Sequence, residues 1–224
     1  MEKGKVIVLE GLDGCGKSTQ LDLALEYLDQ LDVTCRSVSF PNYNALSGQL
    51  VRQYLDGEIP ADGRNGAYAA SAIYAADRYV SYMTDWKGFY EAGGVILSGR
   101  YTTSNAIYQL TKLPPEEHEY FLEWLADFEY GKLGLPKPDL VLFLDMPVEV
   151  SQKLLDKRYL GDSTKKDIHE RNLDYLRECR KNALYTAEKR GWSIIDCSDG
   201  EYPLPIEDIY TEICVRLKEL ISYA

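Results

Sequence analysis

The chain has 224 residues, of which 45% are hydrophobic and 27% charged, and its formal net charge is −11 at pH 7. This length suits a single domain, residues 1–224, that folds without disulfides or a structural metal. The negative charge argues against nucleic-acid or anionic-membrane partners, because both require basic surfaces. No apolar run approaches the roughly 18 residues of a membrane-spanning helix. A polyanionic ligand would therefore need a local basic site.

The cysteines are odd in number and scattered, without C-x-x-C spacing, and no signal peptide precedes the chain. This usage predicts reduced thiols and a cytoplasmic location. The residues are Cys15, Cys35, Cys179, Cys197 and Cys214.

Short apolar runs alternate with helical patterns along the chain. The runs that suit buried strands cover residues 5–10, 34–39, 95–98, 139–144 and 192–196. Helical spacing covers residues 17–31, 46–55, 66–86, 103–109, 115–128, 148–157, 168–189 and 206–223. This alternation predicts an α/β fold, with five parallel strands covered by helices on both faces. Ligands of such sheets bind at the carboxyl ends of the strands, where Asp13, Phe40, Arg100 and Asp145 fall.

The first predicted strand runs into a glycine-rich loop. Gly11, Gly16, Lys17 and Ser18 match the pattern G-x(4)-G-K-[ST], with a strand before it and a helix after it. Glycines let backbone N–H groups surround a phosphate, and the helix N-terminus adds partial positive charge. Lys17 is predicted to reach the β- and γ-phosphates, and Ser18 to hold Mg²⁺. The alternative is a strand-to-helix turn that binds nothing.

Two further groups suit a second nucleotide. Tyr74 and Arg78 share one helix face, and together they can stack on a base and bind its carbonyl edge. Arg100 follows the third strand as a phosphate clamp, and Tyr101, Ser104, Asn105 and Tyr108 follow it along one helix face. The alternatives are that Tyr74 is a core residue and Arg78 a solvated one. The helix after Arg100 would then be one with a few exposed polar residues.

Residues 157–171 concentrate positive charge in an otherwise acidic chain. Beside a phosphate loop, this segment is interpreted as a basic lid over the transferring phosphates, although in isolation it would be a solvated loop. Its cations are Lys157, Arg158, Lys165, Lys166 and Arg171. The two histidines, His118 and His169, are too far apart to indicate a metal site, so Mg²⁺ held mainly by the nucleotide is expected.

Taken together, these motifs resemble the thymidylate kinase family over nearly the whole chain. The matching segments are G-L-D-G-C-G-K-S-T, F-P-N-Y, Y-A-A-D-R-Y, G-R-Y-T-T-S-N-A-I-Y, P-D-L-V-L-F-L-D and D-I-H-E-R. The fourth segment and its spacing from the third are the specific ones. The resemblance implies a P-loop NTPase fold, commonly a homodimer. It also implies transfer of a phosphoryl group from ATP to dTMP, giving dTDP for deoxynucleotide biosynthesis.

The resemblance also implies roles for individual residues. Tyr74 would stack on thymine, Arg78 would bind O4 and Asn105 would contact N3. Arg100 would clamp the acceptor phosphate, and Tyr108 would pack under the deoxyribose. The whole dTMP-binding set is Asp13, Phe40, Pro41, Tyr43, Tyr74, Arg78, Arg100, Tyr101, Asn105, Tyr108 and Glu170.

The donor side is implied in the same way. ATP would be bound by Gly11, Leu12, Asp13, Gly14, Cys15, Gly16, Lys17, Ser18 and Thr19. Ser18 and Asp13 would hold Mg²⁺. The catalytic set would be Lys17, Asp13, Arg100, Arg158 and Arg171.

Two positions depart from the family's pattern. Gly99 stands where the family usually has aspartate, which puts part of the Mg²⁺ and phosphate positioning in doubt. Gly14 stands where one subgroup has a basic residue, so the lid is expected to supply the cations.

Two other functions stay open at this point. A deoxynucleoside kinase would use a carboxylate base where this chain has Arg100 and Asn105. A P-loop switch protein would bind GTP, but no N-K-x-D motif occurs. One D-x-x-G string, Asp85 to Gly88, is expected at a helix end.

Overall fold

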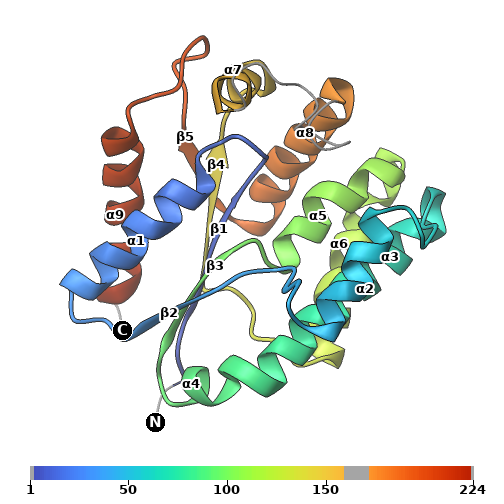
Figure 1. Cartoon of the computed structure of the whole chain (residues 1–224), viewed down its shortest axis with the longest axis horizontal. Helices are drawn as coiled ribbons and strands as arrows, with labels where there is room; N and C mark the ends of the chain where they lie inside the picture. The colour runs from blue at the N-terminus through green and yellow to red at the C-terminus, as the bar shows by residue number, and fades with distance from the viewer. Residues whose placement is uncertain (1–2, 159–171, 223–224) are drawn as a thin grey trace.

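The computed structural model describes residues 3–158 and 172–222. Its centre is a five-stranded sheet in which every paired strand is parallel, in the order β2-β3-β1-β4-β5 (Figure 1). The strands are β1 Val6–Gly11, β2 Cys35–Val38, β3 Val95–Gly99, β4 Leu140–Asp145 and β5 Ser193–Asp196. The predicted α/β class with five parallel strands is confirmed.

The strand register places the functional loops at one edge. Leu9 of β1 pairs with Gly99 of β3, and Gly11 pairs with Leu144 of β4. The carboxyl ends of these three strands therefore lie together. The phosphate loop follows β1 there, and the turn that carries Arg100 follows β3.

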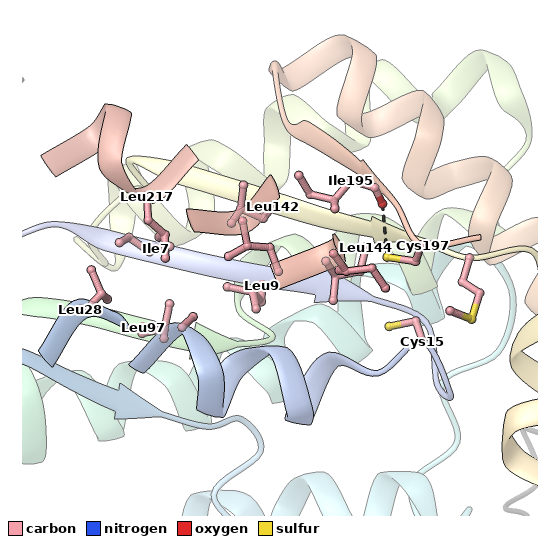
Figure 2. Close-up of a cluster of buried hydrophobic side chains, with 14 of the residues drawn as sticks. Ile7, Leu9, Cys15, Leu28, Leu97, Leu142, Leu144, Ile195, Cys197 and Leu217 are labelled. Atoms are coloured by element: carbon pink, nitrogen blue, oxygen red, sulfur yellow. Dashed lines mark hydrogen bonds between the residues drawn. The ribbon is translucent and has the colours of Figure 1, made fainter. Parts of the chain in front are cut away.

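Alternate residues of β1 contribute to two hydrophobic cores, one on each face of the sheet. Ile7 and Leu9 pack with Leu28 of α1 Lys17–Gln30 and Leu217 of α9 Ile206–Ser222 (Figure 2). Val6 and Val8 face the opposite side, in a cluster that includes the fully buried Trp86 of the π-helix η1 Tyr82–Trp86. Because successive side chains of a strand point to opposite faces, this burial on both sides explains the continuous apolar run.

Helices on the second side of the sheet also carry residues of the candidate site, apart from α6. They are α2 Leu46–Leu55, α3 Gly63–Ser81, α5 Thr102–Gln109, α6 His118–Ala126 and α8 Leu173–Arg190. In Figure 1, α1 and α9 lie on one side of the sheet, and α3, α5 and α8 on the other. The helix α7 Val148–Arg158 packs beside the phosphate loop. Within the described ranges, no helix is long and apolar enough to cross a bilayer.

Two predicted helices differ in detail from those observed. The helix expected over 66–86 begins at Gly63 and continues through the π-helix η1 Tyr82–Trp86 into α4 Lys87–Glu91. The helix expected over 115–128 begins as a 3₁₀ turn, η3 Pro115–Glu117, and ends in the π-helix η4 Asp127–Lys132. A π-turn widens the helix locally, so apolar spacing does not reveal it. The start of the helix expected over 168–189 lies outside the described residues.

Candidate active site

The phosphate loop has the backbone that its glycines predict. Gly14 and Gly16 have φ values of 81° and 84°, a left-handed region that favours glycine. The Lys17 ammonium donates to the Gly11 carbonyl at 3.2 Å. Burial lowers the pKa of Lys17, and the nearby charge of Arg100 lowers it further. Cys15 is buried in the core beneath the loop, which supports its role as a small packing residue.

Gly14 is also fixed by its surroundings. A Cβ there would lie 2.8 Å from Leu155 Cγ and 3.0 Å from the Ser151 carbonyl, both on α7. No side chain fits without a shift of that helix. The loop therefore has no room at this position for the basic residue found in one subgroup of the family.

A cavity of about 710 Å³ opens beside the loop. Ser18 and Thr19 line it at the N-terminus of α1, and Asp13 lines it from the loop. Apolar side chains complete the wall and suit a base: Met146, Leu154, Leu155, Leu204 and Ile206. The cavity combines a phosphate cradle with an apolar slot, as a nucleoside triphosphate site requires. We name it the donor cavity.

A second cavity, of about 270 Å³, lies on the other side of Asp13. We name it the acceptor cavity. Every residue of the predicted dTMP set except Glu170 lines it, including Phe40, Tyr43 and Tyr108. Glu170 lies outside the described residues, as do all lid residues from 159 to 171. Lys157 is exposed on α7, and Arg158 ends that helix.

Arg100 lines the acceptor cavity and pairs with Asp13, which lines both cavities. Its Nη2 lies 2.5 Å from Asp13 Oδ1, and its Nη1 donates to the Tyr108 hydroxyl at 2.9 Å. Burial alone would lower the pKa of Arg100, but Tyr108 and Asp13 hold it well above its ordinary value. The guanidinium is therefore permanently charged, and it lines the acceptor cavity.

The backbone of Arg100 is strained and tightly held. Its φ is 101°, in a region that non-glycine residues rarely adopt. Ser98 Oγ donates to the Arg100 carbonyl at 2.6 Å, and the Tyr101 N–H donates to Glu10 Oε1 at 3.3 Å. Such strain persists only where the surrounding structure fixes it, and here it accompanies a side chain that lines the acceptor cavity.

Glu10, which the sequence analysis did not identify, is a fully buried carboxylate at the end of β1. Its Oε1 also accepts hydrogen bonds from Thr103 Oγ1 at 2.6 Å and Ser104 Oγ at 2.7 Å. These bonds attach the first turn of α5 to the central strand. Glu10 thereby fixes the helix that carries Asn105 and Tyr108.

The far end of the acceptor cavity combines an aromatic ring with polar groups. The Tyr74 ring packs edge-on against Tyr54, with 5.9 Å between ring centroids. Burial raises the pKa of Tyr74, so its hydroxyl stays neutral. Arg78 is buried and forms a two-point ion pair with Glu129. Asn105 donates to the same carboxylate.

Sequence reasoning missed several residues of this cavity. Gln109 is one helical turn beyond Asn105, so extending the helix face would have identified it. Tyr54 and Tyr175 reach the cavity from α2 and α8, and no motif around them indicated this. Glu129 lies beyond the end of its predicted helix. The D-x-x-G string, Asp85 to Gly88, spans the junction of η1 and α4, so it lies inside a helical run and not at the expected helix end.

Comparisons with known proteins agree with this geometry. A family model described as thymidylate kinase matches residues 9–209. A probable thymidylate kinase of Thermococcus kodakarensis is 32% identical over 220 residues, covering 96% of this chain and 98% of that protein. The thymidylate kinase of Plasmodium falciparum is 30% identical over 222 residues, 98% and 92% of the two chains. That of Mycobacterium tuberculosis is 27% identical over 190 residues, 84% and 87% of the two. Neither alternative function is favoured by these matches, and the chain belongs to the thymidylate kinase family.

Proposed function

We propose that the chain transfers the γ-phosphoryl group of ATP to dTMP, giving ADP and dTDP. The observation that carries this proposal is the position of Asp13, which lines both cavities and pairs with Arg100 of the acceptor cavity. A donor phosphate on the loop and an acceptor phosphate on Arg100 would approach each other at this point. Tyr74, Arg78 and Asn105 line the acceptor cavity and would receive the base.

The chain's own residues supply binding and charge. Lys17 neutralises the donor phosphates from the loop, and Arg100 orients the acceptor phosphate for in-line attack. The acceptor is already an anion at neutral pH, so its attack requires no general base. Arg158 and Arg171 are proposed to add positive charge from the lid in the transition state.

Residues present in the donor cavity fit a hard divalent cation. The Ser18 hydroxyl and the Asp13 carboxylate line it together, and both are oxygen ligands of the kind Mg²⁺ prefers. When bound with ATP, Mg²⁺ would neutralise charge on the β- and γ-phosphates.

An ADP-release assay against dTMP, dUMP, dCMP, GMP and thymidine tests the assignment. We expect dTMP to be the best acceptor. Loss of the 5-methyl contact, worth roughly 1 kcal/mol, should make dUMP slower. Preference for dCMP or GMP would refute the thymidylate assignment, and preference for thymidine would favour a deoxynucleoside kinase. Tight GTP binding without turnover would instead indicate a P-loop switch.

We further propose that the enzyme acts as a cytoplasmic homodimer. One face of α3 exposes Ala72, Ala76 and Val80 at successive turns, with Met83 following on η1. The neighbouring α2 exposes Leu46. An uncharged stripe on an acidic protein suits a second copy of itself. Light scattering should give the mass of a dimer for the wild-type chain. The Val80→Glu variant should give the mass of a monomer.

The free cysteines suit a reducing compartment, which supports the cytoplasmic location.

A further inference from the structure

We propose that Glu10 is a positioning residue for the acceptor phosphate, because it holds the backbone turn from which Arg100 extends. The inference rests on the proposed function, in which Arg100 binds that phosphate. Glu10 lies on β1 and is fully buried. It is not among the described residues that line either cavity, so its effect on a nucleotide must pass through a neighbour. A buried carboxylate is costly unless it is paired, and its contacts therefore indicate what it does.

One oxygen of Glu10 accepts three hydrogen bonds from the segment that follows β3. Oε1 accepts from the Tyr101 N–H at 3.3 Å, from Thr103 Oγ1 at 2.6 Å and from Ser104 Oγ at 2.7 Å. Within the described residues, Oε2 is buried and has no partner. Tyr101 is the N-cap residue of α5, but its own side chain does not cap the helix. Glu10 supplies the acceptor from β1 instead, at a helix N-terminus that favours an acidic group.

The peptide group that joins Arg100 to Tyr101 is fixed at both ends. Its carbonyl accepts from Ser98 Oγ at 2.6 Å, and its N–H donates to Glu10. This peptide group follows the strained residue, whose φ is 101°. Gly99, which precedes Arg100, has no side chain that could brace the turn. Without the acceptor on Glu10, the peptide group is free to rotate and the strain at Arg100 to relax, which would redirect the guanidinium.

The guanidinium of Arg100 has its own contacts, but these lie where the ligand binds. Nη2 pairs with Asp13, and Nη1 donates to the Tyr108 hydroxyl. Both partners line the acceptor cavity, so a bound phosphate must share the guanidinium with them. The contacts of Glu10 are made to a backbone group and to hydroxyls, on an oxygen that is fully buried. They therefore continue to hold the turn when the acceptor binds.

The nucleoside end of the cavity is less dependent on Glu10. Asn105 and Tyr108, which would contact the base and the sugar, lie further along α5. Ala106 and Ile107 anchor this part of the helix in two hydrophobic clusters. Loss of Glu10 should consequently disturb the phosphate contact more than the nucleoside contacts. Because dTMP and thymidine differ only in the phosphate, the ratio of their affinities isolates this effect.

Equilibrium binding of dTMP and thymidine to the full chain, measured by calorimetry without ATP, tests the inference. Glu10→Leu removes the acceptor at similar volume, and the ratio of dTMP to thymidine affinity should fall about tenfold or more. Glu10→Gln is the matched control. Its amide oxygen can accept from the same three donors, and its nitrogen replaces the oxygen that has no partner, so it should recover most of the ratio. On the Arg100→Ala background, Glu10→Leu should lower the ratio little further.

Equal weakening of dTMP and thymidine in Glu10→Leu would overturn the inference, because a purely structural role affects both alike. A glutamine variant no better than the leucine variant would overturn it, as would an undiminished effect on the Arg100→Ala background. If Glu10→Leu does not fold, Thr103→Val decides. It removes one of the three bonds at a residue that does not line the acceptor cavity, and the ratio must fall there too.

The wild-type chain separates this inference from the proposed function. A wild-type chain that does not bind dTMP would overturn the proposed acceptor, and the inference with it. A wild-type chain that binds dTMP more tightly than thymidine, beside variants of Glu10 with an unchanged ratio, would overturn the role of Glu10 alone.

Discussion

Arg100 Nη2 and Asp13 Oδ1 lie 2.5 Å apart, so the guanidinium that lines the acceptor cavity is paired with the phosphate loop. An acceptor phosphate would bind to a group that the donor site already orients. Both side chains are partly exposed, at 22% and 29%, so the pair remains accessible to a ligand. This relationship makes the acceptor site sensitive to changes in the loop.

Arg100→Ala should raise the acceptor KM by about 10- to 100-fold, the range expected for a lost charge-assisted contact. The ATP Kd should change little. Arg100→Lys is the matched control, because it keeps the charge but cannot bind Asp13 and a phosphate together. Steady-state kinetics with dTMP measures the effect. Unchanged dTMP saturation in the alanine variant would show that the third-strand motif has been misread.

Lys17→Ala should lower kcat about 10²-fold or more for every acceptor, since charge on the donor phosphates is then uncompensated. Because burial lowers the pKa of Lys17 in the free enzyme, its charge is lost as pH rises through that lowered value. The kcat/KM for ATP should therefore fall at a less alkaline pH than an ordinary lysine predicts. Lys17→Arg should lack this decline, because a guanidinium stays protonated. A flat wild-type profile would contradict the prediction.

Gly99→Asp restores the carboxylate that the family usually has. A Cβ at Gly99 would lie 3.3 Å from Leu21 Cδ2, so the leucine must move by a few tenths of an ångström. If the carboxylate helps to place Mg²⁺ or the acceptor, turnover should rise or the Mg²⁺ requirement should fall. Gly99→Asn controls for size without charge. A folded but inactive aspartate variant would mean that the pocket is adapted to glycine.

Gly14→Ala should destabilise the fold more than Gly16→Ala. Both positions have positive φ, but a Cβ at Gly16 meets nothing within 4 Å, whereas one at Gly14 meets α7. The difference should be about 1–3 kcal/mol, the usual cost of overpacking. Urea unfolding of both variants measures it. Equal losses of unfolding free energy in the two variants would show that α7 moves away from position 14 at no measurable cost.

The lid prediction concerns residues outside the described part of the chain, apart from the helix end at Arg158. Arg158→Ala, Arg171→Ala and the double variant Lys165→Ala/Lys166→Ala should each be assayed. Loss of a transition-state donor should lower kcat about 10²-fold, with a much smaller change in the ATP KM. Near wild-type turnover in all three would show a solvated loop.

The sequence was informative where function depends on neighbouring residues. The phosphate loop, the β3–α5 turn and the helix bearing Tyr74 are local motifs, and the parallel register brings them together. Their binding roles remain predictions. Glu129 and Arg78 are 51 residues apart in the chain and meet only through tertiary packing. A π-helix places Glu129, and helical periodicity carries no signal for one.

Gly14 and Leu155 limit the routes by which this enzyme can evolve. A basic residue at position 14 would collide with α7, so a lineage with this pair cannot gain a loop cation in one step. Leu155 would have to shrink first, and the intermediate would lose packing beneath the phosphate loop. The effect of a substitution at position 14 is therefore expected to depend on the residue at position 155. Inhibitors built around a loop cation would find none at this position, and resistance could not arise by acquiring one there.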